Sequence, residues 1–290
     1  MREMTETQGK IEEHLPFSVA MSVYKNDSPQ FLERALESIT KKQTIVPNEI
    51  LLVVDGPIAV ELNEVIEKYS LEYKNLKVIR LPENKGLGNA LKIAVENCHY
   101  EFIARMDSDD VSLENRFEQQ LTFFKQNENI DIVGGDITEF IGEESNIIGQ
   151  RTVPMQDKKI KEYMKKRCAM NHVAVMYKKS SVLRVGNYQD WPWNEDYYLW
   201  VRMLKEGCRF ANTGTILVNV RVGEDMYRRR GGWRYFKSEA KLQKYMKKNK
   251  IIGFGTYVMN VAKRFIVQVL LPNKIRGWVF KKFARKNVKE

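Results

Sequence analysis

The stretch Phe102-Ile-Ala-Arg-Met-Asp-Ser-Asp-Asp110 does most to determine which fold the sequence favours. Its apolar first half is typical of a buried strand, and Asp107, Asp109 and Asp110 follow at once. Open α/β sheets bind ligands at the carboxyl ends of their strands, so this strand would deliver its carboxylates to a binding edge. Carboxylate oxygens suit a hard divalent cation, which also keeps places for substrate phosphates. The stretch therefore predicts an enzyme with a metal-bound diphosphate, and an acidic loop or helix cap is the alternative.

A regular alternation of strands and helices leads up to this stretch. Strands are predicted at residues 17–23, 50–54 and 76–81, and apolar helical stripes follow each of them. Ser28 and Pro29 form a helix start, with a capping side chain followed by proline. This order predicts an α/β fold with a mostly parallel central sheet flanked by helices on both faces. The polar turns after the strands would then share one edge with the three aspartates.

Beyond the aspartates the pattern is less regular. We expect a helix at 113–126, strands at 130–133 and 137–148 separated by a glycine turn, a strand at 172–177 and a helix at 195–205. Arg105, inside the strand before the aspartates, needs a carboxylate partner that the sequence does not identify. Asp110 is expected to cap the helix that follows it.

Charge is distributed unevenly along the 290 residues, whose formal net charge is +11. Residues 221–290 hold 20 Lys and Arg against 4 Asp and Glu, a net charge of +16, so residues 1–220 carry −5. A basic tail on a mildly acidic body indicates an anionic partner. Three widely spaced cysteines predict neither a zinc site nor a disulfide framework, which fits a reducing compartment.

The tail is predicted to be helical and amphipathic. A basic helix is expected at 233–249, an apolar face within 256–271, and mixed aromatic and basic residues at 275–288. Lys263 and Arg264 disfavour a membrane span, so we expect interfacial helices on an anionic membrane. A hairpin packed on the catalytic domain is the alternative. The predicted organisation is a polar leader without a signal peptide (1–14), a catalytic domain (15–222) and this tail (223–290).

Five short motifs follow one another along the chain, and their order and spacing are informative. They are Ser22-Val-Tyr-Lys-Asn26, Val54-Asp-Gly56, Asn84-Lys-Gly86, Asp107-Ser-Asp-Asp110 and Asn194-Glu-Asp-Tyr-Tyr-Leu-Trp200. With them the chain resembles family-2 glycosyltransferases of the GT-A fold over about residues 15–245. It looks most similar to bacterial enzymes that build capsule, exopolysaccharide and O-antigen units. A single Asp-x-Asp is a weak signal, whereas five elements in order are specific.

The resemblance implies an inverting hexosyltransferase that uses a UDP-sugar donor with Mn²⁺ or Mg²⁺. It also implies a polyprenyl-diphosphate-linked saccharide acceptor at the cytoplasmic face of the inner membrane, where the protein would be peripheral. The residues implied at the donor are Tyr24, Asp55, Asn84, Lys85, Gly86 and Asp107. Asp109, with Asp107, would hold the metal. The turn Asp55-Gly56-Pro57 departs from the family's common Asp-Asp-Gly-Ser, so turn formation is the alternative role of Asp55.

The remaining site predictions concern the acceptor side and a basic loop over the donor. The family pattern implies that the general base is the second carboxylate of Glu195-Asp196, which stands at a helix start; Asp196 could also be only a cap. Trp193, beside this pair, could support the acceptor sugar, and His172 could contact the metal or acceptor phosphate or be structural. Arg230, in a basic glycine-containing loop, would cover the donor diphosphate.

Two other functions compete with glycosyl transfer. A nucleotidyltransferase also uses paired aspartates and a metal, but it would need a glycine-rich basic loop after the first strand, and Tyr24-Lys-Asn-Asp27 lacks the glycines. A nucleic-acid-binding protein would explain the basic tail, but the acidic body and the lack of a recognisable motif argue against it. No nucleic-acid partner is therefore expected.

Overall fold

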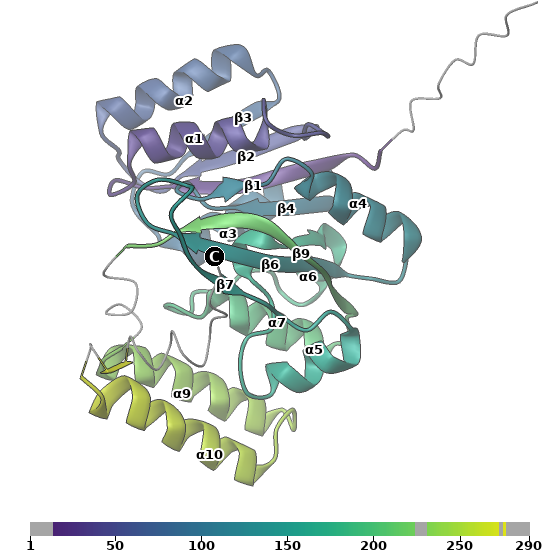
Figure 1. Cartoon of the computed structure of the whole chain (residues 1–290), viewed down its shortest axis with the longest axis vertical. Helices are drawn as coiled ribbons and strands as arrows, with labels where there is room; N and C mark the ends of the chain where they lie inside the picture. Colours follow the sequence, from purple (N-terminus) through teal and green to yellow (C-terminus); the bar gives the residue numbers. More distant parts are fainter. Residues whose placement is uncertain (1–13, 224–230, 273–274, 277–290) are drawn as a thin grey trace, which may run out of the picture.

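The computed structural model describes residues 14–223, 231–272 and 275–276, which form a central sheet with helices on both faces (Figure 1). Residues 1–13 of the predicted leader, Arg230, and most of the tail segment 275–288 lie outside the described residues. The division into leader, catalytic domain and tail therefore stays a prediction.

The described strands form one sheet in the order β3-β2-β1-β4-β8-β6-β9-β5, and β7 pairs with β6. Strands β1 to β4 pair in parallel, β8 is antiparallel to both of its neighbours, and β6 and β9 pair in parallel again. The bounds are β1 (Phe17–Val23), β2 (Glu49–Val54), β3 (Leu76–Arg80), β4 (Phe102–Met106), β5 (Val111–Ser112), β6 (Ile132–Phe140), β7 (Ile147–Arg151), β8 (Met176–Lys178) and β9 (Phe210–Arg221). The predicted α/β fold is confirmed. The run of parallel strands β1 to β4 ends in sequence at Met106, directly before the aspartates.

Helices cover both faces of this sheet, so the central strands are apolar on both sides. Along β2, Leu51 and Val53 face the core that contains α3, α5, α6, α7 and α9, while the residues between them face the core that contains α1, α2 and α4. All six residues of β2 are buried, as expected for a parallel strand between two helical layers. The bounds are α1 (Pro29–Ile39), α2 (Val60–Glu72), α3 (Leu87–Asn97), α4 (Arg116–Gln126), α5 (Asp157–Met164), α6 (Lys179–Arg184), α7 (Glu195–Lys205), α9 (Trp233–Lys248) and α10 (Phe254–Phe265).

The predicted start of α1, both bounds of α7 and the end of α9 agree closely with the structure. The Ser28 hydroxyl accepts a hydrogen bond from the Phe31 amide at 3.4 Å, and Pro29 occupies the first turn of α1. Helix α7 spans the predicted residues 195–205, and α9 ends one residue before the predicted end.

The predicted glycine turn at Gly134-Gly135 is wrong, because β6 runs straight through both residues. A β-carbon on Gly134 would collide with Asn212, and one on Gly135 with Leu217, both from β9. The glycines therefore allow the close approach of β9 rather than a change of chain direction. The chain turns later, at residues 141–146, before β7.

Two further boundaries differ from the prediction. Helix α4 begins at Arg116, because residues 111–112 form β5 and pair with β9. The Asp110 carboxylate accepts a hydrogen bond from the Arg221 amide at 2.8 Å, so it fastens β9 and does not cap α4. His172 starts a 3₁₀ turn (His172–Ala174), and the strand expected there is shortened to β8.

Helices α9 and α10 form a hairpin that packs on the catalytic body, and a π-helical turn (Ile266–Leu270) extends α10 (Figure 1). Leu242 and Met246 of α9 are buried in the core that also contains α7. The Asn260 side chain of α10 donates a hydrogen bond to the Lys165 carbonyl at 2.9 Å. Among the described residues, every helix is too short or too polar to cross a bilayer.

Candidate active site

A cavity of about 770 Å³ opens where β1, β2 and β4 end. Eight residues that the sequence or the resemblance singled out line it together. They are Tyr24, Asp55, Asn84, Gly86, Asp107, Asp109, Trp193 and Glu195. The parallel topology explains the convergence, because successive strands deliver their following turns to the same edge.

The Asp55 side chain organises the turn that follows β3. Its two carboxylate oxygens accept hydrogen bonds from the backbone amides of Lys85, at 2.7 Å, and Gly86, at 2.9 Å. Gly56 adopts a φ of +88°, and a β-carbon there would lie 2.6 Å from the Asn84 nitrogen. The Asp-Gly pair after β2 thus positions residues 84–86. The Lys85 side chain is exposed and does not line the cavity.

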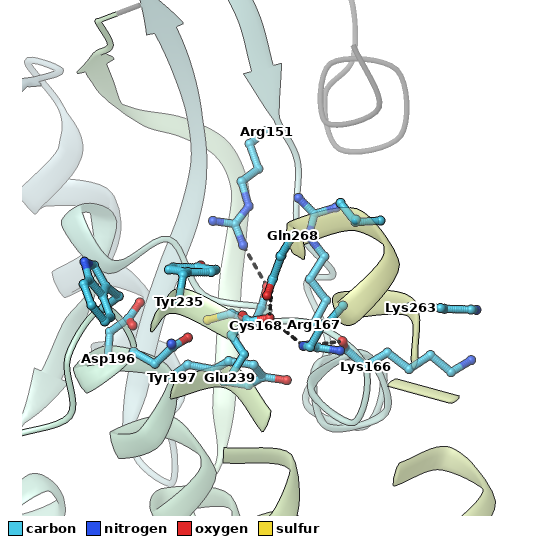
Figure 2. A pocket seen from close by; sticks show the side chains of 14 residues that line it. Arg151, Lys166, Arg167, Cys168, Asp196, Tyr197, Tyr235, Glu239, Lys263 and Gln268 are labelled. Carbon is cyan, nitrogen blue, oxygen red and sulfur yellow. Dashed lines mark hydrogen bonds and ion pairs between the residues drawn. The ribbon is translucent and has the colours of Figure 1, made fainter. Parts of the chain in front are cut away.

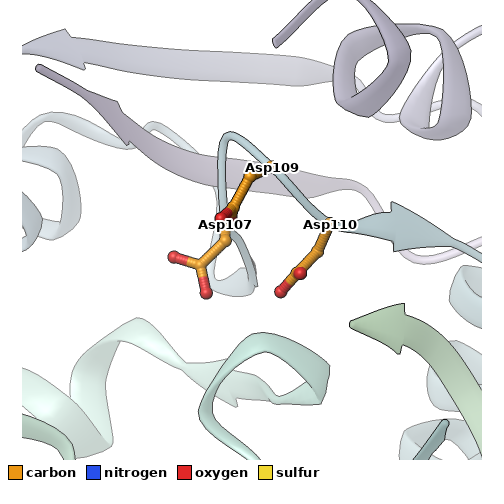
Figure 3. A group of neighbouring side chains, drawn as sticks. All are labelled: Asp107, Asp109 and Asp110. Carbon is orange, nitrogen blue, oxygen red and sulfur yellow. The ribbon is translucent and has the colours of Figure 1, made fainter. Parts of the chain in front are cut away.

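Asp107, Asp109 and Asp110 converge as predicted (Figure 3). Each offers a carboxylate oxygen, and these atoms all lie within 4.8 Å of one another. The partner missing for Arg105 is Asp107, which forms an ion pair with the buried guanidinium. Arg116, also fully buried, donates a hydrogen bond to the Arg105 carbonyl at 2.7 Å, and burial lowers its pKa to about 9.

A fourth acid, Asp27, joins this group and was not among the predicted site residues. Its carboxylate accepts hydrogen bonds from the Ser108 hydroxyl at 2.9 Å and the Tyr24 amide at 3.0 Å. Burial raises the pKa of Asp27. The feature of the sequence that could have identified Asp27 is its place in the polar turn after the first strand, Tyr24-Lys-Asn-Asp27.

The acid cluster fits a divalent cation. Burial and the nearby carboxylates of Asp107 and Asp27 raise the pKa of Asp109 to about 6. Burial and the same kind of repulsion raise the pKa of Asp110 well above its usual range. A bound cation relieves the repulsion between crowded carboxylates and favours their ionised form. Oxygen is the ligand atom that Mg²⁺ and Mn²⁺ accept. Asp107 and Asp109 line the cavity and would hold the ion on its substrate side.

The first two residues of α7 face different cavities. Glu195 lines the cavity with the aspartates, whereas Asp196 lines a second cavity of about 340 Å³. Trp193, 50 % exposed and with a φ of +64°, borders both. Burial and the neighbouring Asp196 raise the pKa of Glu195 to about 7. The structure thus separates the two carboxylates that are adjacent in sequence.

His172 lies among the residues that line neither cavity. Its ring nitrogen Nε2 lies 2.8 Å from the Tyr188 hydroxyl, and its ring packs near Trp200. Burial and the Arg105 charge lower its pKa well below the usual value, which favours a neutral ring. His172 therefore packs between Tyr188 and Trp200 and is not among the residues that line the two cavities.

The second cavity lies between the catalytic body and the α9–α10 hairpin (Figure 2). Asp196 lies at one end of the view, while Lys166 and Lys263 lie at the other. Arg151 reaches it from β7 and donates a hydrogen bond to the Cys168 carbonyl at 2.7 Å. No pattern in the sequence predicted this cavity, because its walls come from five separate segments.

Comparison with known proteins supplies independent information. The model of the family "Glycosyl transferase family 2" matches residues 18–190. The chain is 37 % identical over 270 residues to an Escherichia coli UDP-Gal:alpha-D-GlcNAc-diphosphoundecaprenol beta-1,3-galactosyltransferase, covering 93 % of this chain and 97 % of the relative. It is 33 % identical to the amylovoran biosynthesis glycosyltransferase AmsE of Erwinia amylovora over 266 residues, covering 92 % and 98 %.

Solved structures agree on the fold. S. aureus TarS 1-349 in complex with UDP-GlcNAc superposes with a TM-score of 0.62 at 16 % identity, covering 87 % of this chain and 73 % of that one. At that identity the likeness concerns the arrangement of helices and strands alone.

Proposed function

Because the chain belongs to glycosyltransferase family 2, we propose that it transfers a hexose from a UDP-sugar to a lipid-linked saccharide during bacterial surface polysaccharide synthesis. The family membership favours glycosyl transfer over nucleotidyl transfer or nucleic-acid binding. The galactosyltransferase relative named above acts, by its name, on a diphosphoundecaprenol-linked sugar with UDP-Gal, which supports the same classes of donor and acceptor here.

One observation carries the proposal: the acid cluster, the turn at residues 84–86 and the start of α7 surround a single cavity. Asp55 fixes the turn so that it can meet the nucleoside, and Tyr24 lines the same cavity. Asp107 and Asp109 would hold Mn²⁺ or Mg²⁺, which, when bound, neutralises charge on the departing diphosphate. Arg105 forms an ion pair with Asp107 and orients its carboxylate.

Asp196 is our proposed general base. The acceptor hydroxyl oxygen forms the new bond to the anomeric carbon, its proton passes to the Asp196 carboxylate, and the bond to UDP breaks. One such displacement inverts the anomeric configuration. The Asp196 position supports this role, since its cavity adjoins the donor cavity at Trp193 and leaves room for a separate acceptor. Glu195, whose pKa of about 7 leaves it largely protonated in mildly acidic solution, would donate a hydrogen bond into the donor cavity.

We further propose that the protein is peripheral at the anionic cytoplasmic face of the inner membrane. Apolar residues of α10 and its extension are exposed at intervals of four: Phe254, Val258, Ala262, Ile266 and Leu270. The Phe254 side chain is 67 % exposed. The Lys247 ammonium lies over the Phe254 ring, 4.9 Å from its centroid, and the exposed Lys263 follows Ala262 in the chain. An apolar face bordered by lysines is the usual form of an interfacial helix on anionic lipid.

A donor and acceptor screen tests the proposal. Release of UDP is measured from UDP-galactose, UDP-glucose and UDP-N-acetylglucosamine, with and without a polyprenyl-diphosphate-linked N-acetylglucosamine, in Mn²⁺, Mg²⁺ or chelator. We expect release that needs both the lipid-linked acceptor and a divalent cation, and a product of inverted configuration. Full activity in excess chelator would contradict the metal proposal, and no acceptor-dependent release from any UDP-sugar would contradict the function.

A further inference from the structure

The second cavity carries more positive charge than the described residues neutralise. Arg264 is paired with Glu239 at 2.6 Å, so these two charges cancel. No described carboxylate forms an ion pair with Lys166, Arg167 or Lys263, although all three side chains line the cavity. Like charges gathered around one hollow repel one another, and such a group indicates a site for an anion.

Hydrogen bonds hold the walls of the second cavity in place. The Arg151 guanidinium is fixed by its hydrogen bond to the Cys168 carbonyl, and Arg264 donates to the Lys166 carbonyl at 3.0 Å. The segment that carries Lys166 and Arg167 is therefore tied both to β7 and to α10. Guanidinium groups held in this way can bond two oxygens of a phosphate at once, which favours a phosphate or diphosphate over a single carboxylate.

The cavity also connects two regions that the proposed function needs to connect. Lys263 and Val267 line it, and each follows by one residue a member of the apolar stripe, Ala262 or Ile266. One wall of the cavity is therefore adjacent, around the same helix, to the face proposed to lie on the membrane. The other end reaches Asp196 and Trp193, and Trp193 also borders the donor cavity.

We propose that this cavity binds the diphosphate of the lipid-linked acceptor, an assignment that rests on the proposed transfer to such an acceptor. The lipid chain lies along the α10 stripe, the diphosphate lies among Arg151, Lys166, Arg167 and Lys263, and the sugar hydroxyl reaches Asp196. The hairpin thus forms part of the acceptor site and is more than an anchor.

The test compares two variants that lose the same charge. The cavity variant is Arg167→Gln with Lys263→Gln, and its matched control is Lys165→Gln with Lys244→Gln, two exposed lysines outside the cavity. Transfer is measured to the acceptor sugar on a lipid diphosphate and to the same sugar on a neutral alkyl chain. We expect the cavity variant to lose about tenfold or more in kcat/KM for the diphosphate acceptor. The neutral acceptor and the control variant should change little. Equal losses with both acceptors, or in both variants, would overturn the assignment.

A binding measurement separates this inference from the proposed function. Full-length protein is titrated by calorimetry with farnesyl diphosphate in excess chelator, which prevents binding through a metal at the acid cluster. Wild type should bind, the cavity variant should bind at least about tenfold more weakly, and the control should match wild type. This pattern without any sugar transfer would leave the diphosphate site standing and refute only the transferase proposal. No binding by wild type, or inorganic diphosphate binding as tightly as the isoprenyl form, would refute a site for a lipid diphosphate.

Discussion

Glu195→Gln should stabilise the protein in alkaline solution and hardly affect it in acid. In the folded chain, burial and Asp196 raise the pKa of Glu195 to about 7, from an ordinary value near 4.5. The folded state therefore prefers the protonated carboxyl, and the contribution of Glu195 to stability falls as the pH rises from the unfolded pKa through the folded one. Glutamine resembles the protonated form in size and hydrogen bonding but cannot ionise.

The size of the effect follows from the shift. Since one pKa unit corresponds to 1.36 kcal/mol, the full shift corresponds to about 3 kcal/mol of stability lost by wild type at pH 8, but less than about 1 kcal/mol at pH 5. For a chain of this length we expect about 2 °C in Tm per kcal/mol, so the variant should melt about 5 °C higher at pH 8 and about 1–2 °C higher at pH 5.

The assay is thermal unfolding of metal-free protein followed by circular dichroism from pH 5 to pH 8. The matched control is Glu61→Gln, an exposed glutamate in the first turn of α2, which corrects for the loss of a favourable charge at a helix start. A gain in Tm that is the same at pH 5 and pH 8, or one that Glu61→Gln reproduces, would refute the argument that Glu195 is held protonated by its surroundings.

Four further outcomes follow from the site and the hairpin. Asp196→Asn should lower kcat by about 10²-fold or more with UDP affinity unchanged, and an active variant would contradict its role as base. Asp109→Asn should abolish the dependence of UDP binding on Mn²⁺, measured by calorimetry with and without the metal. Gly56→Ala should weaken UDP binding, because its β-carbon would displace the turn that follows β3; unchanged affinity would show that the turn adapts. Val258→Asp should reduce flotation with anionic liposomes, while Val60→Asp on α2, where the valine is more exposed still, should not.

The sequence predicted those elements whose signals are local. Strand β1 and helix α7 were predicted with the observed bounds, because an apolar run and an amphipathic stripe with acidic residues in its first turn are both visible within a dozen residues. Strand β9 was missed, since Gly214 interrupts it and its pairing with β6 joins segments about 80 residues apart. The same long-range pairing explains why two glycines of β6 were misread as a turn.

The same distinction between local and long-range signals applies to the residues of the candidate site. Turns after parallel strands could be assigned to one edge from topology alone, so the residues expected there from Tyr24 to Asp109 line one cavity, with the exception of Lys85. The pairing of Arg105 with Asp107, the inclusion of Asp27 and the second cavity depend on where side chains meet in three dimensions. The sequence order Glu195-Asp196 likewise carries no sign that the two carboxylates face different cavities.

The charges around the acid cluster explain why its arrangement favours ligand binding over stability. Arg105 neutralises Asp107, but Asp109 and Asp110 both have raised pKa values, so neither finds enough compensation in the protein. Arg116 adds a second buried cation, yet it bonds to backbone carbonyls and to Gln120 and makes no ion pair with the cluster. A buried carboxylate such as Asp110 that is left in this state lowers stability, and such groups gather where a ligand completes them. A divalent cation would supply the positive charge that the acid cluster lacks. The second cavity lacks negative charge instead, so it suits an anion. The two cavities meet at Trp193, so the hydroxyl to be glycosylated would arrive between the site we propose for metal-bound UDP and the site we propose for a lipid diphosphate.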